Sequence, residues 1–153
     1  MDVKFINPFL DSVLNILPML GISDIKKNGI SIQENQIESP GVIIIVGISG
    51  DIRGNVIYGT TTDCAKGIAA SMMMGMAVEN FDEIAQSAIS ELSNMLAANA
   101  ATNFSNMDIT IDISPPTLIY GSFTANASTD KVLCIELLVN GLPFYVNVAI
   151  DKA

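Results

Sequence analysis

Apolar residues recur every three or four positions, the spacing of an α-helix, in three segments of the chain: residues 5–20, 61–77 and 80–103. In the first segment Asn7 can cap the helix, Pro8 suits its first turn, and Pro18 and Gly21 can end it. The third segment lies in the longest stretch without Gly or Pro and is predicted to be one long amphipathic helix. Its expected inner face consists of Ala85, Ile89, Leu92, Leu96 and Asn99.

The remaining segments show strand signals and lie before, between and after the helices: residues 23–36, 42–48, 55–60, 107–113, 117–120, 131–139 and 144–150. The β-branched run from Val42 to Ile48 suits a strand buried on both faces, and we expect it to form a hairpin with residues 55–60 across a rather long connection. A turn is expected at residues 27–29. Pro115-Pro116 should halt the strand before it, and Asn140-Gly141 is typical of a tight hairpin turn.

The order of these elements is helix, strands, two helices, strands. Such an order favours an α+β fold, in which the helices pack on one face of a largely antiparallel sheet. A chain of 153 residues is most simply one domain, residues 1–153. Each half contains a helix followed by strands, which indicates an internal duplication.

Composition narrows the chemistry that this domain can perform. The chain has no His, and its 16 Asp and Glu against 7 Lys and Arg give a net charge of −9. The absence of His excludes catalysis by a Ser-His-Asp triad or a Cys-His pair, and it excludes most zinc sites. The acidic balance provides no basic surface for nucleic acid or anionic lipid. We interpret the charge mainly as a means of keeping an apolar domain soluble.

The two cysteines and the N-terminus indicate a cellular compartment. Cys64 and Cys134 are far apart and form no C-x-x-C motif, so we expect two reduced, buried thiols rather than a disulfide. Asp2 and Pro8 are unlike a signal peptide. The longest apolar run, residues 42–48, is far too short to cross a bilayer. The protein is therefore expected in the cytoplasm, without membrane insertion.

The outer face of the long helix carries the candidate chemistry. Glu91 and Asn94 are three positions apart, which places both side chains on one face of a helix. A solvated face is the default interpretation of such a pair, but Asn is a poor helix former and calls for a reason in mid-helix. The residues around the pair are small and would let a partner protein approach closely: Ser87, Ser90, Ala98 and Ala101.

Four segments resemble one family. SELSNMLAANA resembles the signature of the CheX, CheC and FliY chemotaxis phosphatases, in which a Glu, two residues and an Asn precede a small residue followed by Asn-Ala. INPFLDSVLNILPMLG is similar to the opening CheX helix, GDIRGNVIYGTTTDCAKGIAASMMMG to the hairpin and next helix, and DISPPTLIYG to the double-proline segment. The likeness spans nearly the whole chain in the same order, and it implies a CheC-like fold.

Two features distinguish this chain within the family. Members of the CheC type carry two copies of the Glu/Asn motif, whereas Asp11 and Asn15 of the first helix form D-x-x-x-N. This difference favours the single-site CheX type. Ala98 stands where a Gly often precedes the Asn, and its extra bulk can alter how closely a partner docks without removing a functional group.

The resemblance also implies a substrate and a role for each residue. The expected substrate is the aspartyl phosphate of a CheY-like response regulator in chemotaxis signalling. Its Mg²⁺ belongs to the regulator, so this chain is expected to need no metal or cofactor of its own. Phosphoryl transfer depends on positioning more than on a strong base. Asn94 is therefore expected to hold the attacking water, and Glu91 to contact the regulator's active-site lysine.

An alternative function is a non-catalytic adaptor that binds a response regulator or a flagellar switch component. The intact Glu91/Asn94 pair favours the phosphatase. The family resemblance further implies a homodimer formed through the sheets. Residues 141–148, or residues 122–130 as an edge strand, are candidates for the pairing strand.

Overall fold

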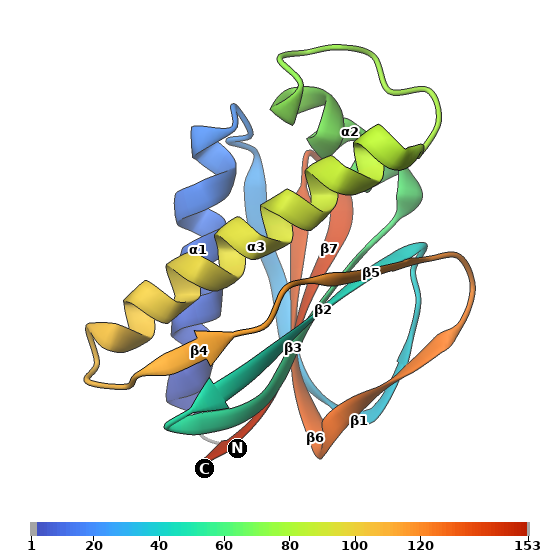
Figure 1. Cartoon of the computed structure of the whole chain (residues 1–153). Coiled ribbons are helices and arrows are strands. Elements are labelled where there is room, and N and C mark those ends of the chain that lie inside the picture. Colours follow the sequence, from blue (N-terminus) through green and yellow to red (C-terminus); the bar gives the residue numbers. More distant parts are fainter. Residues whose placement is uncertain (1–2, 153) are drawn as a thin grey trace.

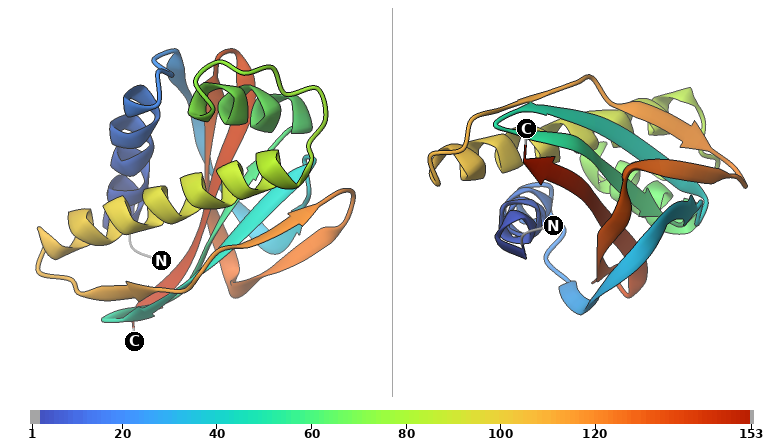
Figure 2. Two further views of the ribbon diagram at one scale, coloured as in Figure 1. Left: turned by 45° about the horizontal axis from the view of Figure 1, so that its top comes forward. Right: turned by 90° about the horizontal axis from the view of Figure 1, so that it is seen from below.

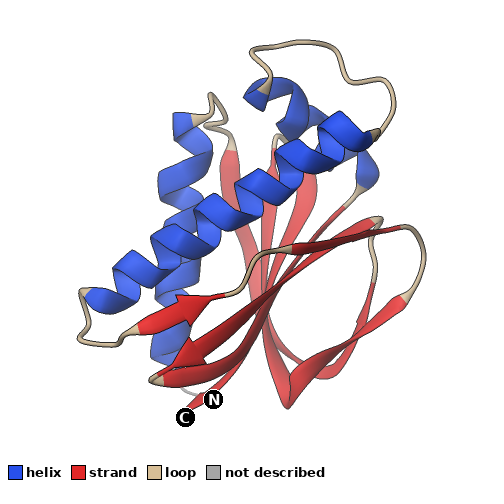
Figure 3. Ribbon diagram, viewed as in Figure 1, coloured by secondary structure: helices blue, strands red, loops and turns tan. Residues whose placement is uncertain are grey.

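One seven-stranded antiparallel sheet forms the centre of the molecule, and helices cover one of its faces (Figures 1 and 3). The computed structural model describes residues 3–152. The helices are η1 (Val3–Phe5), α1 (Ile6–Met19), α2 (Thr62–Met72) and α3 (Glu83–Ser105). The strands are β1 (Ile25–Glu38), β2 (Val42–Gly50), β3 (Ile52–Thr60), β4 (Ile111–Ile113), β5 (Thr117–Tyr120), β6 (Thr124–Val139) and β7 (Leu142–Lys152). The predicted α+β fold class is confirmed.

The sheet has the strand order β1-β6-β7-β3-β2-β4, and β5 pairs with β2 beside β4. With β4 left aside, the order is β1-β6-β7-β3-β2-β5, and exchanging β1 with β5, β2 with β6 and β3 with β7 leaves it unchanged. An internal duplication would produce this arrangement, because each half then supplies one outer strand and one hairpin. Figure 2 shows that the sheet is strongly twisted and that β1 and β6 curl around at its edge.

Two apolar clusters divide the core between the faces of the sheet. The larger one joins the helices to the sheet, and Phe9 of α1, Leu92 of α3 and Val146 of β7 are all buried in it. The smaller one lies on the helix-free face and contains Ile43 of β2 and Ala149 of β7. β7 contributes to both clusters because successive side chains of a strand point to opposite faces.

Helix α3 is fixed against α1 by aromatic and carboxamide side chains. The ring of Phe104 lies 5.4 Å from that of Phe9, edge-on. The Asn99 side-chain oxygen accepts hydrogen bonds from the amides of Asn15, at 3.3 Å, and Asn103, at 3.4 Å. Asn99 is half-buried, so its polar group lies at the α1–α3 boundary rather than within the core. Asn15 is thereby used in holding the two helices together.

The structure corrects three sequence predictions in the first half of the chain. Phe5, not Asn7, is the N-cap of α1, and its side chain makes no capping hydrogen bond. Residues 27–29 form no turn: β1 is continuous there, and Asn28 is a bulge at which the register against β6 shifts. The β2–β3 connection is short, because both strands extend to within one residue of Asp51. Its carboxylate accepts the Thr110 N–H at 2.8 Å.

In the second half, the predicted strand over residues 107–113 is only three residues long. Met107 is exposed, and Asp108 has a left-handed backbone, φ +59°, so the chain turns after α3 before β4 begins. Residues 122–130 are mostly part of β6, which is longer than predicted. The hairpin turn at Asn140-Gly141 is confirmed, and both residues have positive φ.

The cysteines are free thiols and both are buried, as predicted. Burial raises the pKa of the Cys64 thiol. For Cys134, burial and the nearby Glu136 carboxylate raise the pKa to about 11. Protonated, enclosed thiols of this kind are poor nucleophiles.

Within residues 3–152 no helix has the length and apolar character needed to cross a membrane.

Tyr58 gives a test of the core. Its side chain is fully buried against Phe144, and its hydroxyl has no hydrogen-bond partner within the described part of the chain. Because a buried polar group without a partner is costly, Tyr58→Phe is expected to raise the free energy of unfolding by about 1 kcal/mol. Tyr120→Phe, at an exposed tyrosine, should change it by less than about 0.5 kcal/mol. Urea denaturation measures both, and a loss of stability in Tyr58→Phe would contradict the packing described.

Candidate functional site

Helix α3 begins at a well-formed cap. The Asp82 carboxylate accepts the backbone N–H of Ala85 at 3.0 Å, and the Gln86 amide donates to the Phe81 carbonyl at 2.9 Å. Phe81 is buried and contacts the ring of Tyr120 on β5, 5.2 Å between centroids. The start of the helix is therefore tied to the edge of the sheet that carries β5.

The buried face of α3 is wider than the periodicity predicted. Ala85, Ile89, Leu92 and Leu96 are buried as expected. Ser93, Ala97, Ala100 and Phe104 are buried as well. The Ser93 hydroxyl donates to the Ile89 carbonyl at 3.0 Å, which satisfies its polar group inside the core. With this face packed on the sheet and α1, the opposite face of the helix is held outward.

Glu91 and Asn94 both lie on this outward face, and both side chains are exposed. Neither side chain forms a hydrogen bond or an ion pair within the described residues. Three helical positions separate them, about 60° around the axis and about 4.5 Å along it. A carboxylate and a carboxamide are therefore presented side by side, ready to bind groups from outside the chain.

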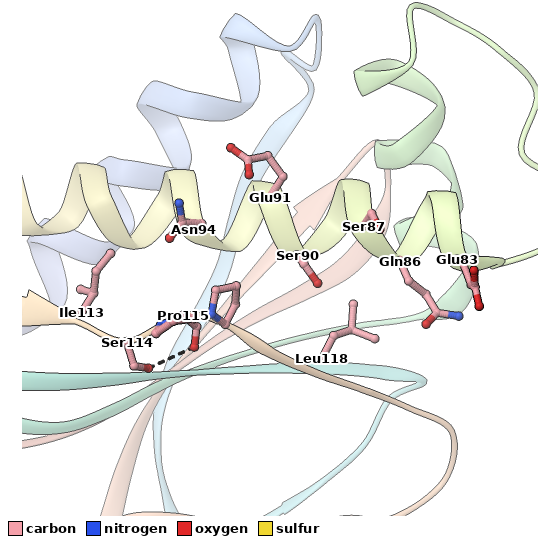
Figure 4. A pocket seen from close by; sticks show the side chains of 11 residues that line it. Glu83, Gln86, Ser87, Ser90, Glu91, Asn94, Ile113, Ser114, Pro115 and Leu118 are labelled. Atoms are coloured by element: carbon pink, nitrogen blue, oxygen red, sulfur yellow. Dashed lines mark hydrogen bonds between the residues drawn. The ribbon is translucent and has the colours of Figure 1, made fainter.

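The two side chains border a groove of about 820 Å³ between α3 and the segment that contains β4 and β5 (Figure 4). The α3 wall consists of Glu83, Gln86, Ser87, Ser90, Glu91 and Asn94. The opposite wall consists of Ile113, Ser114, Pro115, Pro116 and Leu118. In Figure 4, Ser90 and Gln86 point toward this second wall. Glu91 points away from it, on the opposite side of the helix.

The second wall is fixed to the sheet. The Ser114 hydroxyl oxygen accepts the Gly47 N–H at 2.7 Å, and the Ser114 N–H donates to the Gly47 carbonyl at 2.9 Å. The two prolines that follow restrict the backbone further. Gly47 is suited to this contact, because an added Cβ would lie 3.1 Å from the Ser114 hydroxyl oxygen. The groove is thus bounded by a helix and by a segment with little freedom to move.

The structure brings some of the predicted partner-binding residues to the groove and not others. Ser87 and Ser90 line it beside Glu91 and Asn94. Ala98 is exposed one turn further along α3 but lies outside the groove. Ala101 is half-buried and packs against the main core, so its role in partner approach has no support from its position.

Sequence reasoning did not find Glu83, Gln86 or the Ser114–Pro116 segment as site residues. Glu83 carried a usable signal, because it stands eleven positions before Asn94, close to three full helical turns. The local sequence of the Ser114–Pro116 segment gave no such signal, because the position of this segment depends on pairing with β2. The groove contains two carboxylates and no Lys or Arg. Within residues 3–152 no group of three or more His, Cys, Asp and Glu is placed to hold a metal ion.

The comparison with known proteins identifies the family. Residues 42–138 match the family described as chemotaxis phosphatase CheX. The CheY-P phosphatase CheX of Thermotoga maritima is 36% identical over 123 residues, which are 79% of this chain and 78% of that protein. The chain belongs to the CheX family. The family predicted from the sequence is confirmed.

Solved structures show the same CheX-type fold. A CheC-like superfamily protein from Shewanella sp. PV-4 has a TM-score of 0.88 at 24% identity, covering 99% of this chain and 100% of that one. A chain of the CheX–CheY–BeF₃–Mg²⁺ complex from Borrelia burgdorferi has a TM-score of 0.78 at 24% identity, covering 99% of this chain and 100% of that one. At these identities the likeness shows the fold.

Proposed function

We propose that this protein hydrolyses the aspartyl phosphate of a CheY-like response regulator in chemotaxis signalling. The observation that carries the proposal is the exposed Glu91/Asn94 pair on a rigid helix, bordering a groove, in a member of the CheX family. The Thermotoga maritima relative, named a CheY-P phosphatase, supports the substrate class. In this arrangement α3 lies across the regulator's active site, and the reacting phosphoryl group sits near Asn94.

Asn94 would act by positioning the attacking water. Its carboxamide does not titrate, so it is no general base, but it both accepts and donates hydrogen bonds. A water held by both groups would point one lone pair at phosphorus. Because phosphoryl transfer passes through a loose transition state, correct placement of the water contributes more than a strong base would.

Glu91 would set the register of docking by contacting the active-site lysine of the regulator. The Mg²⁺ that neutralises the phosphoryl charge would be held by the regulator, as would the phosphorylated residue. The Borrelia burgdorferi complex, which contains CheY, BeF₃ and Mg²⁺ with CheX, supports such a division. This chain then supplies only the carboxylate and the carboxamide, and needs no cofactor of its own.

The test of this function is phosphate release. CheY-type regulators from the same organism are phosphorylated with a small phosphodonor and mixed with the protein in Mg²⁺. Faster phosphate release than from the regulator alone is the expected result. Binding without faster release would replace the phosphatase by the adaptor function, and no binding would reject both.

We further propose that the protein works in the cytoplasm as a homodimer joined at β1. β7 pairs with both β6 and β3, which leaves residues 144–148 without a free edge. Residues 124–126 of the 122–130 stretch pair with β1 along one edge. β1 ends the strand order. Ile32 on β1 is 70% exposed and lies beside Ile6 and Leu133 in an apolar hollow. Light scattering tests the dimer, and an unchanged dimer in Ile32→Lys would exclude this edge.

A further inference from the structure

Glu83 occupies the same stripe of α3 as the proposed water-positioning residue. At 100° per residue, Glu83 and Asn94 differ by only about 20° around the helix axis and by roughly 16 Å along it. Glu83 lines the groove together with Gln86, and Figure 4 shows both at the end of the groove nearest Leu118. The groove therefore has a carboxylate at the end opposite Asn94.

The side chains on this stripe between Glu83 and Asn94 are short. Ser87 and Ser90 occupy the turns that separate Glu83 from Asn94, and both line the groove. A protein that reaches Asn94 can therefore lie along the whole stripe without meeting a bulky side chain. Any regulator that covers Asn94 and extends over three helical turns would also contact Glu83.

The charge of Glu83 is not paired within residues 3–152. Its side chain is exposed, and within the described residues it forms no ion pair or side-chain hydrogen bond. No Lys or Arg lines the groove. A partner surface complementary to this wall would carry positive charge at two points, one facing Glu91 and one facing Glu83.

We propose that Glu83 is a second docking carboxylate, which binds a Lys or Arg side chain of the response regulator about three helical turns from the reacting phosphoryl group. Glu83 is then a specificity-determining residue: it selects regulators with a basic side chain at that distance and takes no part in the chemical step. This inference rests on the proposed function and names how its substrate is chosen.

A helix-stabilising role is the competing explanation, because an acidic side chain in the first turn also interacts favourably with the helix dipole. The two roles predict different results. Helix stabilisation changes the unfolding midpoint and leaves regulator binding unchanged. A docking contact changes KM and its dependence on salt, and leaves kcat unchanged.

The experiment measures phosphate release from a CheY-type regulator that the wild-type protein accelerates, at low and at high salt. Glu83→Gln is expected to raise KM about two- to fivefold at low ionic strength. Glu83→Lys should raise it about tenfold, because the contact becomes repulsive. Both differences should shrink below about twofold near 0.5 M salt. The kcat of both variants should stay within about twofold of wild type.

Asp63→Asn is the matched control. It removes the same charge from an exposed side chain in the first turn of α2, outside the α3 groove. Binding to the same regulator loaded with beryllium fluoride and Mg²⁺ gives a second readout of affinity. The inference is overturned if Glu83→Gln and Asp63→Asn give the same KM and salt dependence, or if Glu83→Gln lowers kcat. Either result leaves hydrolysis by the wild-type protein, and hence the proposed function, intact.

Discussion

Asn94→Ala is expected to slow phosphate release from the regulator by on the order of a hundredfold while regulator binding changes little. The carboxamide is exposed on the same face of α3 as Glu91, and it can both accept from and donate to one water molecule. Without it the water is free to rotate, and the entropy of positioning it has to be supplied in each reaction. Single-turnover phosphate release measures the rate, and binding to the beryllium fluoride form measures affinity.

A measurement of stability distinguishes the loss of water positioning in Asn94→Ala from damage to the fold. Asn94 is exposed, and its side chain forms no hydrogen bond within the described residues that alanine would remove. Alanine is the better helix former, so the variant should be as stable as wild type or more stable by up to about 0.7 kcal/mol. Activity and stability are thus expected to change in opposite directions. Unfolding would lower both.

Two further substitutions sharpen the test of Asn94. Asn94→Asp keeps the size of the side chain but accepts without donating and adds negative charge beside the phosphate, so it should be as slow as Asn94→Ala. Asn106→Ala removes an exposed carboxamide at the C-terminal end of the same helix, outside the groove, and should react at the wild-type rate. If Asn94→Ala releases phosphate as fast as wild type, Asn94 does not position the water.

The angular position of Glu91 and Asn94 was predictable because helical geometry is local. Once Ala85, Leu92 and Leu96 are assigned to the core, the outward direction of residues 91 and 94 follows from the 3.6-residue period. The strands from residue 42 and across Asn140-Gly141 were predictable for a similar reason: β-branched runs and Asn-Gly turns carry their own conformational preference.

The second wall of the groove was not predictable in the same way. Its position depends on Ser114 pairing with Gly47, a contact across 67 residues that no local pattern encodes. Small residues also gave a poor signal for burial: Ala97 and Ala100 are buried at the α3 contacts although they suit an exposed helix face equally well. At Asn28, Lys-Asn-Gly favours a turn locally, but pairing of β1 with β6 on both sides makes it a bulge.

Gly54→Ala is expected to destabilise the protein by about 3 kcal/mol or more. Gly54 lies on β3, paired with Ile48 of β2 on one side and Ile150 of β7 on the other. Its φ is +148°, and an added Cβ would lie 1.9 Å from the Ala149 carbonyl oxygen. These are backbone atoms of β7, which cannot move aside as a flexible side chain would, so the sheet must distort or the strand must shift.

The distortion caused by Gly54→Ala is expected to reach the groove through β2. Gly47, which holds Ser114 of the second wall, is one residue from Ile48, the partner of Gly54. Gly54→Ala should therefore lower both the urea midpoint and the fraction of active phosphatase.

Gly29→Ala is the matched control, because Gly29 on β1 has nothing within 4 Å of an added Cβ and needs no positive φ. It should change stability by less than about 0.5 kcal/mol. If Gly54→Ala unfolds at the wild-type urea concentration, the pairing of β3 with β7 at this position cannot be as close as the structure places it.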